Sequence, residues 1–185
     1  MFSAPPSYST TLLAFMKRKA SLRYRIISLS AGTILFLLLL PSLFFAVGRF
    51  FSRAFPVDWP REIEIGVACF TIPLGLFFLV WATLTQWRIG QGTPAPNAPT
   101  QRLVVEGPYK LCRNPIQLGA VLYYAGTGSL FGDLSTGLVC LLLVLIVGGG
   151  YHKFVEEKEL ELRFGAAYSA YRRQTPFLIP RIWKR

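Results

Sequence analysis

Two long runs without a charged side chain dominate the hydrophobic pattern of this chain: residues 26–47 and residues 65–87. Each run exceeds the roughly 20 residues that a helix needs to cross the hydrocarbon core of a bilayer. An uninterrupted apolar run of this length is typical of a membrane-spanning helix and far less common in a soluble core. We therefore predict a transmembrane helix in each run.

A third apolar stretch covers residues 116–151 and contains a single charged residue, Asp133, next to Gly132. As one helix, these 36 residues would measure about 54 Å, well beyond the thickness of a bilayer. A Gly-Asp pair favours a tight turn. We expect two shorter helices, 116–131 and 134–151, and therefore about four transmembrane helices in all.

The composition agrees with an all-α integral membrane protein, because 52% of the 185 residues are hydrophobic and only 16% are charged. We expect a single membrane domain over residues 1–185. Within it, residues 1–25 form a cytoplasmic interfacial segment, 26–151 the four transmembrane helices, and 152–185 a cytoplasmic C-terminal helix and tail. Residues 11–25 suit either a short helix on the anionic inner leaflet or a plain topology anchor. No cleavable signal peptide is expected, because the first apolar run is too long for one.

The 20 lysine and arginine residues indicate the orientation. Seventeen precede the first run, lie between the second and third, or follow residue 151, whereas Arg49, Arg53 and Arg61 alone fall on the opposite side. The positive-inside rule then places both termini of this multi-pass protein in the cytoplasm. We expect the membrane to be a bacterial inner membrane. The net charge of +11 is thereby explained without a nucleic-acid partner, since no soluble basic domain gathers these charges.

The three cysteines and one histidine do not form a recognisable site. Cys69 and Cys140 lie inside apolar runs, so a disulfide framework is not expected, and no Cys-His cluster predicts a metal site. The chain also lacks a Rossmann G-x-G-x-x-G and a Walker loop. A nucleotide-like cofactor would have to be held in another way.

A compact polar block at residues 107–119 lies between the second and third apolar runs. Asn114-Pro115 is a favourable start for a helix, with Asn at the N-cap and Pro in the first turn. A helix start also attracts anions, and Arg113 stands beside it. Ahead of the block, residues 90–100 carry three prolines and two glycines and predict an extended, linker-like path. Residues 103–108 are typical of a short strand and a turn.

The last segment carries an acidic cluster directly after the fourth predicted helix. On one helix, Glu157, Leu160, Phe164, Tyr168 and Tyr171 share a continuous face. Glu159 is spaced to pair with Arg163, and Glu161 lies off that face, so we expect Glu159 and Glu161 to be solvated surface charges. Glu156 and Glu157 are either a solvated helix start or carboxylates that face a site at the membrane edge.

These two motifs, in this order, resemble the isoprenylcysteine carboxyl methyltransferase and phospholipid methyltransferase superfamily. The resemblance rests on Gly107-Pro108-Tyr109, Arg113-Asn114-Pro115, Leu118-Gly119 and Glu156-Glu157 with the aromatic residues that follow, and it covers about residues 93–180. It implies a membrane enzyme that uses S-adenosylmethionine as methyl donor. The cofactor-binding residues that it implies are Tyr109, Arg113, Asn114, Pro115, Leu118, Gly119, His152, Glu156 and Glu157, with Arg113 and Glu157 the candidate catalytic pair.

Two departures from the superfamily pattern bear on the mechanism. Asn114 stands where the superfamily often has histidine, and asparagine at this position resembles a bacterial-type variant. Gln117 stands where the superfamily often has tyrosine. An asparagine cannot act as a general base near neutral pH. A carboxylate or thiol acceptor, methylated as its anion, needs no such base, whereas a lipid amine would need one, with Glu156 or Glu157 as candidates.

The substrate is expected to be a lipid or a lipophilic small molecule that enters from the bilayer, and the oligomeric state is left open. Two other functions are considered. A sterol-type membrane reductase would bind NADPH, but such enzymes usually have more helices than 185 residues allow. A non-catalytic membrane scaffold of the same fold is the third alternative, and Gln117 is the residue that favours it.

Overall fold

The computed structural model describes residues 20–180, and within that range the chain consists of helices and loops without a strand. The interfacial segment expected at 1–25 lies almost wholly outside the described residues. The helical elements, in chain order, are α2 (Leu22–Ile34), η1 (Leu35–Leu39), α3 (Leu40–Ala54), α4 (Arg61–Thr85), η2 (Gln86–Gly90), η3 (Gly107–Lys110), α5 (Pro115–Phe131), α6 (Leu134–Tyr151), η4 (His152–Glu156), α7 (Glu157–Phe164) and α8 (Ala166–Gln174).

Three helices within 20–180 are long and apolar enough to cross a membrane: Leu22–Ala54, Arg61–Gly90 and Leu134–Gln174. They contain three of the four predicted spans. The expected count of four is not reached when helices are judged by length and apolar composition. The fourth candidate, α5, has only 17 residues, or about 26 Å of helix. Many large apolar side chains, such as Phe70, Leu142 and Ile146, are exposed on the outside of the bundle. Such a surface suits lipid and would be unusual in a water-soluble monomer.

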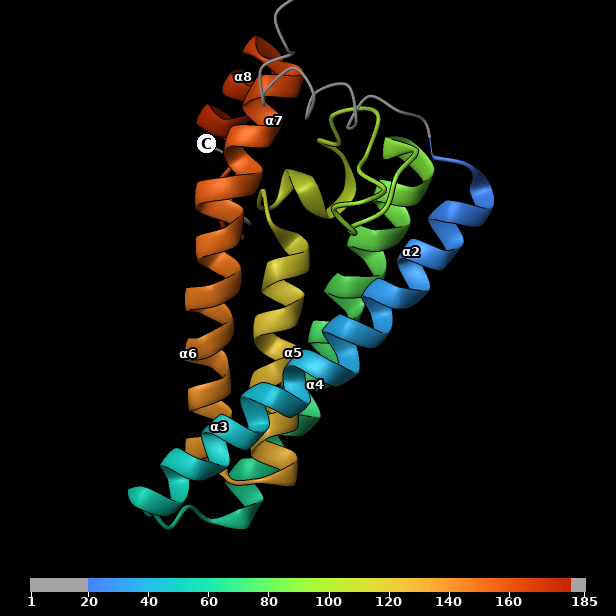
Figure 1. Ribbon diagram of the computed structural model, residues 1–185. Coiled ribbons are helices and arrows are strands. Elements are labelled where there is room, and N and C mark those ends of the chain that lie inside the picture. The colour runs from blue at the N-terminus through green and yellow to red at the C-terminus, as the bar shows by residue number, and fades with distance from the viewer. Residues whose placement is uncertain (1–19, 181–185) are drawn as a thin grey trace, which may run out of the picture.

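Helix α5 packs between α4 and α6, while α3 crosses α6 (Figure 1). The turn before α6 forms as predicted, because Asp133 is the N-cap of α6 and accepts a hydrogen bond from the Thr136 N–H at 2.7 Å. The core between these helices is formed by Phe44, Val121, Tyr124, Cys140 and Val144. Phe44 and Tyr124 meet edge to face at 5.7 Å between ring centroids.

The first long helix changes its hydrogen bonding at η1 for identifiable reasons. The Leu40 N–H bonds to the Leu35 carbonyl, five residues back, so the Phe36 carbonyl loses its usual donor, and the Tyr124 hydroxyl donates to it at 2.6 Å. Pro41 has no N–H for the Leu37 carbonyl, and the Tyr123 hydroxyl supplies that bond at 3.1 Å. Two tyrosines of α5 thus satisfy carbonyls that would otherwise be unpaired in a membrane.

Two details beyond the bundle differ from the sequence-based expectation. Residues 103–108 form no strand, since residues 103–105 are irregular and a short 3₁₀ turn starts at Gly107. The single C-terminal helical face expected from Glu157 to Tyr171 is interrupted, because Gly165 has φ +51° and separates α7 from α8. Helix α6 continues through η4 into α7, so the polar segment after residue 151 extends the last long helix.

Candidate functional site

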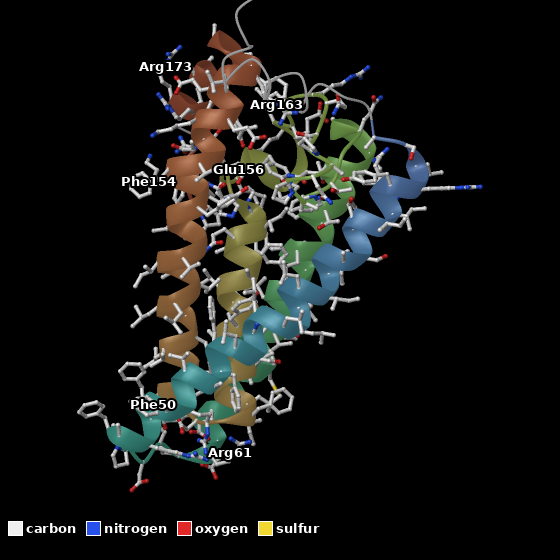
Figure 2. All side chains as sticks on the ribbon, in the orientation of Figure 1. Phe50, Arg61, Phe154, Glu156, Arg163 and Arg173 are labelled. Carbon is white, nitrogen blue, oxygen red and sulfur yellow. The ribbon has the colours of Figure 1, made fainter. Side chains whose placement is uncertain are left out.

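A cavity of about 610 Å³ opens at one end of the bundle, within the size range of small-molecule sites. Figure 2 shows Glu156 and Arg163 at this end, and Phe50 and Arg61 at the opposite end. The part of the cavity within the bundle is apolar, lined by Leu29, Phe36, Leu40, Leu76, Leu79 and Val144 among others. The outer part carries polar and charged side chains. The polar end therefore adjoins an apolar interior in one continuous space.

The charged residues of the cavity wall are Arg113, His152, Glu156, Glu159 and Arg163, a group that we call the charged wall. His152 and Glu156, one helical turn apart, contact each other through their side chains. Arg163 donates to Glu159 at 3.2 Å. The wall thus offers cationic side chains and two carboxylates, Glu156 and Glu159, to a ligand.

The Glu159–Arg163 pair forms as its spacing predicts, but Glu159, expected to be a solvated surface charge, has a side chain that is only 21% exposed. The Arg163 side chain is only 6% exposed, and it also donates to the Thr100 carbonyl of the loop that follows η2. Burial raises the pKa of Glu159, an effect that the charge of Arg163 opposes. Glu161, by contrast, is exposed as predicted.

The loop between η2 and η3, residues 91–106, covers part of the cavity, and we call it the covering loop. Its prolines suggested a linker, yet Ala98 is fully buried, and Thr93 and Ala98 are joined by a backbone hydrogen bond of 2.8 Å. Arg25 of α2 donates to the Trp87 and Gly92 carbonyls, at 2.8 and 3.3 Å, and its guanidinium lies 3.9 Å from the centroid of the Trp87 ring. The loop is held from both sides of the cavity.

Arg113 is the most constrained side chain of the site. It donates to Glu157 Oε1 at 2.5 Å and to the Arg172 and Thr175 carbonyls at 2.8 and 3.3 Å. Its Nε is buried without a hydrogen-bond partner. The guanidinium is therefore fixed in place while keeping one free donor.

The segment after α8 pairs with the start of α5, a contact that no sequence motif suggested. The Arg113 N–H donates to the Pro176 carbonyl at 2.8 Å, and the Asn114 N–H to the Phe177 carbonyl at 3.2 Å. Asn114 is the N-cap residue and Pro115 the first residue of α5, as predicted, but Asn114 makes no side-chain cap. Its Nδ2 donates to the Phe177 carbonyl at 3.0 Å instead.

Of the residues implied by the resemblance, Tyr109, Arg113, Asn114, His152 and Glu156 line the same cavity. Pro115, Leu118, Gly119 and Glu157 lie outside its lining. Gly119 faces α4, where a Cβ would meet the Gly75 carbonyl oxygen at 2.8 Å. Glu157 is buried behind Arg113 and also accepts from Lys153 at 3.1 Å. The predicted residues thus divide into a cavity-lining group and a supporting group.

Other residues of the cavity wall were missed by motif reasoning. They include Ser28 of α2, Gln86 at the start of η2, and the charged pair Glu159 and Arg163. Gln117, noted as a departure from the superfamily pattern, is 3% exposed and donates from Nε2 to the Val144 carbonyl at 2.6 Å. Its amide therefore ties α5 to α6. Among the residues that the structure describes, no group of three or more His, Cys, Asp or Glu side chains could hold a metal ion.

Comparison with known proteins agrees with this arrangement. The family model for phospholipid methyltransferases matches residues 63–167, more than half of the 185-residue chain. The chain belongs to the phospholipid methyltransferase family. The match begins in α4, includes the polar block and the charged wall, and ends at the start of α8. Membership in this family, together with three membrane-capable helices, makes the chain an integral membrane protein.

One curated relative of this phospholipid methyltransferase family member is methanethiol S-methyltransferase 2 of Bradyrhizobium diazoefficiens. The two are 35% identical over 78 residues, which are 42% of this chain and 28% of the relative. The alignment therefore covers little more than a quarter of the relative's length. No solved structure matches the chain.

Proposed function

We propose that this chain transfers a methyl group from S-adenosylmethionine to a lipophilic or amphipathic acceptor at the cytoplasmic membrane face. The observation that carries the proposal is the single cavity in which the charged wall adjoins an apolar interior. A zwitterionic cofactor needs charges of both signs, and an acceptor with an apolar body needs an apolar surface. Both requirements are met in this one cavity.

The residues present fit the cofactor. Arg113 Nε is a free, buried donor suited to the methionine carboxylate. Glu156 and Glu159 line the cavity and suit the ammonium group. Glu157 would act through Arg113, as a positioning residue that holds the guanidinium at 2.5 Å. S-adenosylmethionine would supply an electrophilic methyl group.

The chain's own contribution would be alignment and exclusion of water. Leu76, Leu79, Ile116 and Val144 give the inner cavity an apolar lining, which would exclude water and strengthen the electrostatic contacts at its polar end. Alignment of reacting groups can supply roughly 7 kcal/mol or more of a barrier. An anionic thiolate or carboxylate acceptor needs no general base. The name of the relative, methanethiol S-methyltransferase, favours a thiol among these acceptors. For an amine, Glu156 is the cavity-lining base candidate.

We also propose that α5 is a fourth crossing. It packs between α4 and α6 over its 17 residues, and polar Asn114 and Asp133 flank it. Both chain ends would then lie in the cytoplasm, on the side of the charged wall, as the distribution of lysine and arginine predicts.

Calorimetric titration of the purified protein in detergent tests the cofactor. S-adenosylmethionine should bind and NADPH should not, and the reverse result would favour the reductase. Binding of neither ligand would favour the scaffold. Extracts of cells that overproduce the chain should contain a lipid or thiol whose mass rises by about 14 Da per methyl group.

Glu157→Gln tests the positioning role. A hydrogen bond to a charged group contributes about 1.5–3 kcal/mol, so the variant should bind S-adenosylmethionine about ten- to a hundredfold more weakly. Glu161→Gln, which alters an exposed glutamate of the same helix, is the matched control and should bind normally. Equal affinity of both variants and the unmodified chain would contradict the role of Glu157.

A further inference from the structure

The cavity wall contains an unusual share of unpaired buried polar atoms. Among residues 20–180, six buried side-chain nitrogen or oxygen atoms have no hydrogen-bond partner. Four of the six belong to residues that line this one cavity: Ser28 Oγ, Gln86 Oε1, Tyr109 OH and Arg113 Nε. An unpaired buried polar atom destabilises the folded state, because it has lost its hydrogen bonds to water. Such atoms gathered at one cavity point to a ligand that supplies the missing partners.

Three of these four atoms carry no formal charge and come from three different segments. Ser28 lies on α2, Gln86 begins η2, and Tyr109 lies on η3. We call these three residues the neutral wall. Every charged residue in the cavity lining belongs to the charged wall. The polar end of the cavity is thus divided between a charged and an uncharged hydrogen-bonding surface.

The backbone at Gln86 supports a binding role. Gln86 begins a π-helical segment that ends at Gly90, and the next residue, Gln91, has φ +54°. Short π-helical segments inside α-helices occur frequently at functional sites. The other two described π-helical segments, η1 and η4, also contribute residues to this cavity, including Phe36 and His152.

The chemistry of the neutral wall suits an uncharged partner. Gln86 Oε1 is an acceptor only, so it needs a donor, whereas the serine and tyrosine hydroxyls can donate or accept. Burial raises the pKa of Tyr109 well above its ordinary value, and the negative charge of Glu156 adds to this effect, whereas the neighbouring Gln86 side chain has a smaller opposing effect on that pKa. The phenol is therefore neutral and keeps its proton near neutral pH. Ser28 is 3% and Tyr109 6% exposed, so water competes little for these bonds.

We propose that Ser28, Gln86 and Tyr109 form a subsite for the uncharged adenine ring of the cofactor, opposite the zwitterion held by the charged wall. This inference rests on the proposed function. Adenine presents an amine donor and ring-nitrogen acceptors on one edge, and glutamine pairs well with such an edge. The amine would meet Gln86 Oε1, and the hydroxyls would donate to ring nitrogens.

The test compares S-adenosylhomocysteine with S-inosylhomocysteine, in which a carbonyl replaces the adenine amine. Calorimetry on the full chain in detergent should show about tenfold tighter binding of the adenosyl compound, the effect of about one hydrogen bond. In Gln86→Met, which keeps the length of the side chain, this preference should fall to about twofold or less. Tyr109→Phe should weaken binding of the adenosyl compound about tenfold by loss of its hydroxyl.

Glu157→Gln is the matched control, because it disturbs the charged wall alone and should weaken both compounds by the same factor. Thermal melting of each variant shows whether it is folded. A tenfold preference that survives in Gln86→Met, or no preference in the unmodified chain, would overturn the adenine subsite and leave the proposed function standing. If the unmodified chain binds neither compound, the subsite and the proposed function both fail.

Discussion

At the scale of single residues, Cys112 lies inside the polar block and is fully buried. Burial raises the pKa of its thiol to about 11, against a weaker opposing hydrogen bond from the Asn114 backbone. The thiolate is the reactive form, so at pH 8 only about one molecule in a thousand carries it. Cys112 should therefore resist alkylation in the folded protein.

The prediction is checked in a Cys69→Ser variant, which removes the exposed cysteine and leaves buried Cys112 and Cys140. Iodoacetamide should modify Cys112 slowly in mild detergent and rapidly after denaturation in SDS, as read by mass spectrometry. Raising the pH toward 11 should speed the reaction if access remains. Rapid modification at pH 8 under native conditions would show that the block between Tyr109 and Arg113 opens.

The polar block also shows how far residue-level reasoning reaches. The start of α5 at Asn114-Pro115 was predicted because capping is a local property of a few residues. The contact of Asn114 with Phe177 was not, because it joins residues 63 positions apart. Glu159 and Arg163 show the same difference between local and long-range contacts. Their i, i+4 spacing predicted the pair, while its burial depends on the Thr100 carbonyl of a distant loop.

At the scale of elements, α4 and α5 approach each other through glycines. A Cβ on Gly75 would meet the Tyr123 nitrogen at 2.6 Å and the Gly119 carbonyl oxygen at 2.8 Å, and a Cβ on Gly119 would meet the Gly75 carbonyl oxygen at 2.8 Å. Small residues permit such close helix packing in membranes. Gly75→Ala and Gly119→Ala should each lower the free energy of unfolding by about 1–3 kcal/mol.

Gly149→Ala is the control for these variants, because a Cβ at Gly149 meets nothing within 4 Å. Thermal melting in detergent should place both α4–α5 variants below the control. The same proteins test the sequence-based expectation that Gly119 contacts the cofactor. A Gly119→Ala protein that melts normally but loses S-adenosylmethionine binding would support that contact over the packing role.

The turn between α5 and α6 depends on Asp133, which accepts from Arg49 at 2.8 Å and from Ser52 at 2.5 Å. Burial works to raise the pKa of Asp133, but bonds from Ser52 and Thr136 and the charge of Arg49 outweigh it, so the pKa is lowered. The carboxylate therefore stabilises the fold above its ordinary pKa, and this stability is lost as pH falls through the lowered value.

Asp133→Asn removes the charge but retains a good N-cap, whereas Asp133→Ala removes both. At pH 7, thermal melting should show a loss of about 0.5–1 kcal/mol for Asn, as for a partly exposed ion pair, and about 1 kcal/mol more for Ala. The deficit of the Asn variant should shrink below about pH 4 as Asp133 itself becomes protonated. A deficit that stays constant with pH would exclude the ion pair as its cause.

The helices themselves followed from the charge-free runs, because a bilayer demands long apolar segments with satisfied backbone groups. The π-helical segments did not, since they depend on partners elsewhere: Tyr124 completes the bonding of η1 across the bundle. The same limit applies to the cavity wall. The motif at 107–119 and Glu156 indicated one side of it, while Ser28 and Gln86 enter only through the packing of α2 and α4.

At the scale of the whole molecule, the two ends of the bundle differ in a way that bears on orientation. Figure 1 shows the start of α2, the covering loop and α7–α8 at one end, and the α3–α4 and α5–α6 connections at the other. Arg49 and Arg61 lie at the second end, where they are paired with Asp133 and Glu64. The opposite end carries the cations that the positive-inside rule assigns to the cytoplasm.

The two-sided arrangement predicts the outcome of reporter fusions. Green fluorescent protein fused after Arg185 should fluoresce, since it matures in the cytoplasm, and alkaline phosphatase at the same point should be inactive. Phosphatase inserted in the α3–α4 connection, between Ala54 and Arg61, should be active outside.

If α5 did not cross, the connection between α5 and α6 would lie on the cytoplasmic side. Phosphatase inserted between Phe131 and Leu134 would then be inactive, which would contradict four crossings, whereas activity there and inactivity after Arg185 would support them.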